Sequence, residues 1–223
     1  MDRICPMALR LLLDSADPLA WDQWLPLNLF RGVTTNPTLL QRAQQPCSID
    51  NLKELTQRAL AHGVQELHLQ AWGADLLTCG RVLADLAPER VWVKLPITRA
   101  GIEAAQKLQD DGLRITFTAC YEPQQVLLAA ALGVDYIAPY LGRISDQGRD
   151  GHAEIITMQR CLDRLGSTTR LLVASLRSAS DLPRLAAEGV DTFTISAAIA
   201  QDLLQVEASE AAALQFELDA AGG

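Results

Sequence analysis

The chain has 223 residues, 49% of them hydrophobic, which is enough to bury one large core or two small ones. Its formal net charge of −8 argues against nucleic acid or an anionic membrane as a main partner, because both are negatively charged. The sequence has no apolar stretch that approaches the length of a membrane span and no signal-peptide pattern, so we expect a cytoplasmic protein.

Eight short β-rich runs alternate with helical patterns along the chain, and most are apolar on both faces, as in parallel strands covered by helices. Several helical stretches end in glycine just before a run, which suits the left-handed residue that closes a helix. The runs are 11–13, 32–35, 66–70, 91–95, 114–118, 136–140, 171–176 and 192–196, and the glycines are Gly63, Gly112, Gly133 and Gly189.

Eight alternating units without a linker favour a closed (β/α)8 TIM barrel that forms a single domain over residues 1–223. The alternative is a doubly wound open sheet. Residues 207–220 predict an additional C-terminal helix, amphipathic through Ala208, Ala211, Leu214 and Leu218 on one stripe. Such a helix would cap the barrel or dock on a neighbouring subunit.

The cysteines and histidines of the chain do not form a metal-binding pattern. The five cysteines are widely spaced, include no Cys-x-x-Cys pair and are typical of reduced thiols. The three histidines have no metal-ligand spacing with them, so the sequence predicts no metal site.

Lys94 is one of only three lysines among 19 basic residues, and it lies in the apolar run 91–98. Burial of an ammonium group disfavours its charged form and lowers its pKa. A neutral amine can attack a carbonyl to give a Schiff base. The alternative is a lysine that reaches water from the end of its strand or pairs with a carboxylate. The run around Lys94 taken alone leaves both interpretations open.

Polar side chains stand near the carboxyl ends of seven predicted strands, where barrel enzymes carry out their chemistry. Each has an individual structural explanation, such as a helix cap, a turn or a packed aromatic ring, but the recurrence at consecutive strands indicates a common site. These residues are Asp14, Thr34, Asn36, Gln70, Lys94, Thr118, Tyr140, Arg143, Ser175 and Arg177.

Schiff-base chemistry suggests a role for each group. Asp14 is the only acid placed to move protons to and from a carbinolamine and a substrate hydroxyl. A water held by Gln70, Thr118 and Tyr140 would relay those protons.

The remaining residues are expected to bind substrate. Thr34 and Asn36 are expected to orient the lysine and the substrate hydroxyls. Arg143, Ser175 and Arg177 supply two cations and a hydroxyl donor, which suit a phosphate group.

Five short segments contain most of these residues. They are Leu13-Asp14-Ser15-Ala16-Asp17, Gly32-Val33-Thr34-Thr35-Asn36-Pro37, Val93-Lys94-Leu95-Pro96-Ile97-Thr98, Ala138-Pro139-Tyr140-Leu141-Gly142-Arg143-Ile144 and Ala174-Ser175-Leu176-Arg177. Together they resemble the transaldolase family, specifically its short branch with fructose-6-phosphate aldolase and the small bacterial transaldolases. The similarity covers residues 10 to about 205.

The resemblance implies a class I mechanism without metal or organic cofactor. Lys94 would form the Schiff base and Asp14 would be the acid/base, with Arg143, Ser175 and Arg177 at the sugar phosphate. The resemblance also implies a homo-oligomer, a pentamer or decamer, although the C-terminal tail is shorter than is typical of these aldolases.

Two positions look diagnostic within the family. Glutamine and tyrosine, found here as Gln70 and Tyr140, resemble the aldolases, whereas glutamate and phenylalanine are typical of the transaldolases. Arg177 departs from the lysine of the aldolase pattern. Three further unusual residues are expected to reshape the pocket: Trp72, Thr116 and Phe117.

The leading interpretation is therefore a lyase that cleaves fructose 6-phosphate reversibly to dihydroxyacetone and glyceraldehyde 3-phosphate. The alternative is a transaldolase that moves the same three-carbon unit between sugar phosphates in the pentose phosphate pathway. A barrel that only binds sugar phosphates is a third reading, against which the desolvated Lys94 argues.

Overall fold

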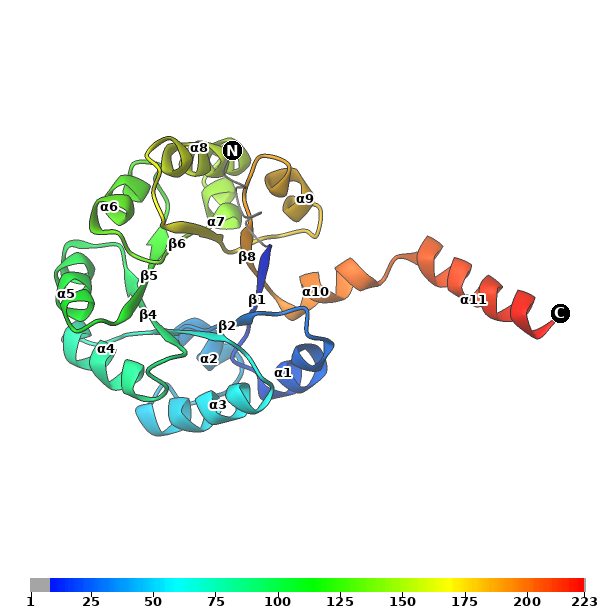
Figure 1. Ribbon diagram of the computed structural model, residues 1–223, viewed down its shortest axis with the longest axis horizontal. Helices are drawn as coiled ribbons and strands as arrows, with labels where there is room; N and C mark the ends of the chain where they lie inside the picture. Colours follow the sequence, from blue (N-terminus) through cyan, green and yellow to red (C-terminus); the bar gives the residue numbers. More distant parts are fainter. Residues whose placement is uncertain (1–8, 223) are drawn as a thin grey trace, which may run out of the picture.

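The computed structural model describes residues 9–222, and its eight strands close into a parallel barrel in chain order (Figure 1). β1 pairs with both β2 and β8, so the sheet has no free edge. The predicted TIM barrel is confirmed, and the open-sheet alternative is wrong. The strands are β1 (Arg10–Asp14), β2 (Gly32–Thr34), β3 (Glu66–Gln70), β4 (Val91–Pro96), β5 (Arg114–Cys120), β6 (Tyr136–Pro139), β7 (Arg170–Val173) and β8 (Thr192–Ile195).

Helices surround the barrel, and two short ones, α2 and α7, directly follow β2 and β6 ahead of the longer α3 and α8 (Figure 1). The four predicted helix-closing glycines all have positive φ, between 65° and 94°. The helices are α1 (Pro18–Trp24), the 3-10 turn η1 (Leu25–Leu27), α2 (Pro37–Arg42), α3 (Ile49–Ala61), α4 (Leu76–Asp85), α5 (Arg99–Asp110), α6 (Gln125–Leu132), α7 (Leu141–Asp146), α8 (Gly151–Arg164), α9 (Asp181–Ala186), α10 (Ala197–Leu204) and α11 (Glu207–Ala221).

The amino end of the barrel interior is closed by a polar network around Glu66, which is fully buried. Its carboxylate accepts hydrogen bonds from Tyr136 (2.7 Å) and Arg10 (3.2 Å) and pairs with Arg31. Burial by itself would raise the pKa of Glu66, but hydrogen bonds from His68 and Arg31 outweigh it and lower the pKa to about 2. This end of the barrel is therefore tied together by a buried carboxylate and its cationic partners.

The C-terminal helix α11 forms where predicted, but its predicted amphipathic stripe is wrong. Leu214 and Leu218 are four residues apart and share a face, whereas Phe216 points to the opposite side. All three are exposed, by 63%, 59% and 69%, and no residue of α11 is buried. The helix extends away from the barrel (Figure 1), so it does not cap it.

Two further findings concern the described part of the chain. None of its helices combines the length and the apolar character that crossing a bilayer requires. Its cysteines, Cys47, Cys79, Cys120 and Cys161, are free thiols, while Cys5 lies outside the described residues.

Candidate active site

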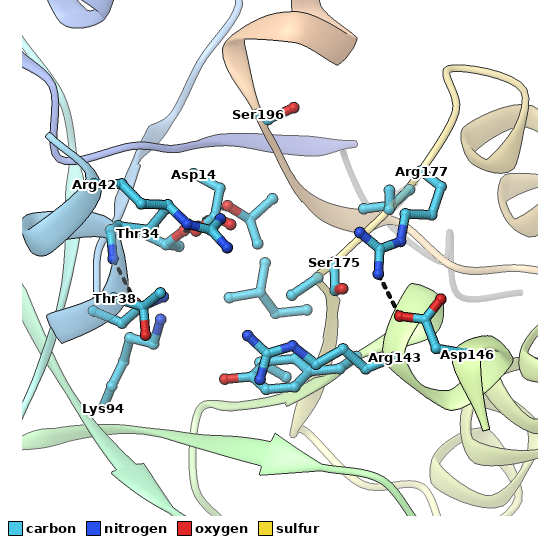
Figure 2. A pocket seen from close by; sticks show the side chains of 18 residues that line it. Asp14, Thr34, Thr38, Arg42, Lys94, Arg143, Asp146, Ser175, Arg177 and Ser196 are labelled. Carbon is cyan, nitrogen blue, oxygen red and sulfur yellow. Dashed lines mark hydrogen bonds and ion pairs between the residues drawn. The ribbon is translucent and has the colours of Figure 1, made fainter.

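A cavity of about 530 Å³ opens at the carboxyl ends of the strands (Figure 2). It brings together eight of the ten predicted site residues, which come from different parts of the barrel. Those that line it are Asp14, Thr34, Asn36, Lys94, Tyr140, Arg143, Ser175 and Arg177.

Lys94 is 4% exposed, and its Nζ donates a hydrogen bond to the backbone carbonyl of Thr35 at 3.0 Å. Burial lowers its pKa below the ordinary lysine value, and the charge of Asp14 offsets part of that shift. The ion pair that would hold a buried lysine charged is absent among the described residues. Lys94 is therefore a desolvated amine in the cavity lining, with a pKa lowered by burial.

Asp14 is held by the hydroxyl of Thr34, which donates to Asp14 Oδ1 at 2.6 Å. Thr34 also lies 2.6 Å from the hydroxyl of Thr194 on β8, and the β1–β2 register sets Asp14 beside Thr34. Thr34 was expected to orient the lysine; instead its hydroxyl orients the carboxylate. Asn36 caps α2 by accepting a hydrogen bond from the backbone N–H of Leu39 at 3.0 Å, and it lines the cavity.

The Tyr140 hydroxyl lies 2.7 Å from the hydroxyl of Thr118. Thr118 is buried behind the cavity wall and reaches the site only through this contact. Arg143 stacks over the Tyr140 ring, with 4.7 Å from guanidinium carbon to ring centroid, and donates to the Tyr121 hydroxyl at 3.2 Å. The two hydroxyls form a pair that can hold a water at the edge of the cavity.

Several predicted residues lie elsewhere. Gln70 is the sheet partner of Lys94 but does not line the cavity. Trp72, Thr116 and Phe117 also do not line it, so any effect they have on the pocket does not come from direct contact. Thr116 instead hydrogen-bonds His68 inside the barrel, at 2.8 Å, and Phe117 is fully buried in the core.

Ser175 and Arg177 lie on a loop after β7 that is fixed from several sides. Ser175 adopts a left-handed conformation with φ 59°, which costs free energy for a residue with a side chain and needs support from its surroundings. The Asp181 carboxylate accepts from the backbone of Arg177 and of Ser178, each at 3.1 Å. The side chain of Arg177 forms an ion pair with Asp146 at 2.5 Å.

Gly142 allows α7 to approach this loop. Its backbone N–H donates to Ser175 O at 2.8 Å. A Cβ atom added to Gly142 would lie 2.4 Å from that oxygen and 2.5 Å from Arg177 Nε. The close contact brings Arg143, the next residue, onto the same wall of the cavity as Ser175 and Arg177.

The prediction of site residues from the carboxyl ends of the strands did not include several cavity residues that lie on helices. Thr38 and Arg42 come from α2, and Asp146 comes from α7. Helical spacing was the available sequence signal for Thr38 and Arg42, because they are four residues apart and share a face of α2. Thr194 and Ser196, at the end of β8, also line the cavity and were not singled out.

The comparisons with known proteins agree with this architecture. The profile of the family described as Transaldolase/Fructose-6-phosphate aldolase matches residues 73–221. A probable transaldolase of Caulobacter vibrioides (strain NA1000 / CB15N) is 34% identical over 212 residues, which are 95% of this chain and 96% of that protein.

Two further relatives carry the same name. The probable transaldolase of Caulobacter sp. (strain K31) is 33% identical over 96% of this chain and 97% of its own. That of Roseobacter denitrificans (strain ATCC 33942 / OCh 114) is 31% identical over 95% of this chain and 96% of its own. The chain therefore belongs to the transaldolase/fructose-6-phosphate aldolase family of enzymes.

Proposed function

We propose that the protein is a class I aldolase that cleaves fructose 6-phosphate to dihydroxyacetone and glyceraldehyde 3-phosphate, and catalyses the reverse reaction. The observation that carries the proposal is the buried amine of Lys94 in a cavity that also holds the Asp14 carboxylate. A barrel that merely bound sugar phosphates would have no use for a desolvated lysine.

The proposed cleavage begins when Lys94 Nζ attacks the C2 carbonyl to give a carbinolamine, which loses water to form a protonated imine. The Asp14 carboxylate then takes the proton of the C4 hydroxyl. The C3–C4 bond breaks, its electrons move into the imine to give an enamine, and glyceraldehyde 3-phosphate leaves. Protonation of the enamine at C3 and hydrolysis of the imine release dihydroxyacetone and restore the free lysine.

The release step distinguishes a lyase from a transferase. An aldolase must protonate and hydrolyse the three-carbon enamine, whereas a transaldolase holds it until an aldehyde acceptor arrives. The paired hydroxyls of Tyr140 and Thr118 support the lyase, because they can hold the water that release requires.

The second candidate is a transaldolase. The names of the relatives favour it, as does Arg177, since arginine at this position resembles the transaldolases. The two candidates share the lysine, the acid and the phosphate-binding residues, and they differ only in the fate of the enamine.

Fructose 6-phosphate assayed with and without erythrose 4-phosphate tests the choice. The wild type should release free dihydroxyacetone without an acceptor. Tyr140→Phe should slow that release, by about 10²-fold or more if the hydroxyl assists proton transfer, while borohydride still traps the adduct. Gln70→Glu should shift the enzyme toward transfer. A wild type that forms the adduct but turns over only with erythrose 4-phosphate is a transaldolase.

We also propose that the protein works as a cytoplasmic homo-oligomer, with small sugar phosphates rather than nucleic acid or membrane as its partners. The exposed apolar side chains on opposite sides of α11 support assembly with further copies of the chain.

A further inference from the structure

Tyr121 lies directly after β5 and does not line the cavity, yet it contacts two residues that do. Its hydroxyl accepts a hydrogen bond from Arg143 Nη1 at 3.2 Å. Its ring meets the ring of Tyr140 edge to face, with 5.5 Å between the centroids and 81° between the planes. Because Arg143 also stacks on Tyr140, the three side chains form one cluster at the cavity wall.

An irregularity near the end of β5 turns Tyr121 toward this cluster. The register between β5 and β6 shifts there, because β5 contains an extra residue. Ala119, within this bulge, has φ 57°, a left-handed conformation that costs free energy for a residue with a side chain. Side chains alternate along a regular strand, so Thr118 and Tyr121, three residues apart, would face opposite ways. With the bulge, both contact Tyr140.

The backbone around Tyr121 is fixed by two further sets of contacts. The N–H groups of Tyr121 and Glu122 donate to Gln125 Oε1 at 2.8 and 3.0 Å. Both carboxylate oxygens of Glu122 accept hydrogen bonds from Arg149, at 2.7 and 3.0 Å. Arg149 lies in the chain that follows α7, the helix that carries Arg143, so this ion pair ties the loop after β5 to that helix.

Arg143 is an exposed side chain that extends from α7 into the cavity (Figure 2). A long side chain that is free to change rotamer loses this freedom when a ligand binds, and the loss costs binding free energy. The contact with Tyr121 removes part of that cost before the ligand arrives. It uses one N–H donor of the guanidinium and leaves the others for a phosphate.

We propose that Tyr121 is a positioning residue, whose hydroxyl holds Arg143 over the Tyr140 ring in the geometry that binds the substrate phosphate. The inference rests on the proposed function, because it takes Arg143 as a ligand of that phosphate. The preference for phosphorylated over unphosphorylated aldehydes then depends in part on a hydroxyl group that lies outside the cavity lining.

A double-mutant cycle tests the proposal by calorimetric titration with glucitol 6-phosphate, a probe that lacks a carbonyl and cannot react with Lys94. Tyr121→Phe removes the hydroxyl and keeps the ring. It should weaken binding about two- to tenfold, the effect of ordering one long side chain. In the Arg143→Ala background the same change should cause no further loss, because the hydroxyl acts only through Arg143.

Tyr136→Phe is the matched control, because it removes a tyrosine hydroxyl from the network around Glu66 at the other end of the barrel. It should leave the affinity for glucitol 6-phosphate unchanged. In the synthetic direction, Tyr121→Phe should raise the KM for glyceraldehyde 3-phosphate and leave the KM for glyceraldehyde unchanged. No loss of affinity in Tyr121→Phe, or an equal loss with and without Arg143, would overturn the proposal.

Borohydride trapping with wild type and dihydroxyacetone separates this proposal from the proposed function. If Lys94 forms no adduct, the aldolase proposal fails, while a loss in Tyr121→Phe that depends on Arg143 still supports the positioning role. If the adduct forms but the loss does not depend on Arg143, the Tyr121 proposal alone fails.

Discussion

The two arginines proposed to bind phosphate, Arg143 and Arg177, differ in how firmly the protein holds them. Arg143 is fixed by Tyr140 and Tyr121, whereas the exposed side chain of Arg177 has Asp146 as its only partner within residues 9–222. A phosphate that binds Arg177 must therefore share it with a carboxylate.

Replacement of Arg143 or Arg177 by alanine should weaken the binding of phosphorylated substrates more than the binding of unphosphorylated ones. Loss of one charge-assisted contact of about 1.5–3 kcal/mol corresponds to roughly tenfold or more in affinity. The KM for glyceraldehyde 3-phosphate in the synthetic direction should rise by that factor, and the KM for glyceraldehyde should change little. Equal changes for the two aldehydes would show that the arginines only support the structure.

Glu66 is a stability residue at the opposite end of the barrel from the site. Its pKa is lowered from 4.5 to about 2, so it stabilises the fold above pH 4.5, and this contribution disappears as the pH falls toward 2. Glu66→Gln should lower the unfolding free energy at pH 7 by about 1–3 kcal/mol, because it removes the charge that accepts hydrogen bonds from the partly exposed Arg10 and Arg31.

Denaturant unfolding at several pH values measures this effect. The difference between wild type and Glu66→Gln should shrink as the pH falls from 4.5 to 2. Glu89→Gln is the control, since the exposed pair of Glu89 with Arg114 should contribute less than about 1 kcal/mol. A constant difference across this pH range would be inconsistent with an ionised Glu66 as the source of the stability.

At the scale of elements, sequence patterns predicted the barrel well and the cavity wall only in part. The strands were predictable because both their faces are buried, and the closing glycines because positive φ favours glycine. The spacing of Thr38 and Arg42 on α2 was a signal that strand ends do not include, whereas the place of Asp146 on α7 was not predictable, since it depends on close approaches such as that of Gly142 to Ser175. That Gln70 does not line the cavity likewise depends on how side chains fill the barrel mouth.

The helix α11 shows a different limit of sequence reasoning. Ala208, Ala211, Leu214 and Leu218 suggested a stripe, but Phe216 on the other face removes the polar side that an amphipathic surface helix needs. A helix with apolar groups on both faces that buries none of them and extends away from its own barrel is suited to lie between two other copies of the chain.

The apolar residues of α11 should therefore control assembly. Combined replacement of Leu214, Phe216 and Leu218 by glutamate should convert an oligomer into a monomer, as measured by light scattering on a size-exclusion column. Leu165→Glu, which changes a leucine of the barrel that is 59% exposed, should leave the assembly unchanged. A wild type that is itself monomeric would contradict this role of α11.

At the scale of the whole molecule, the closed barrel separates stability from chemistry. The buried network around Glu66 ties the amino ends of the strands, while Lys94, Asp14 and the arginines gather at the carboxyl ends. Loops and short helices at one end can therefore change substrate preference without disturbing the packing at the other.

The central claim is that Lys94 forms a Schiff base with the substrate. Wild type treated with dihydroxyacetone or fructose 6-phosphate and borohydride should carry one covalent adduct, which peptide mapping finds on Lys94. Lys94→Arg should carry none, because arginine stays protonated and cannot form an imine. The exposed residues Lys53 and Lys107 are internal controls. An adduct on either of them instead, or no adduct at all, would contradict the account.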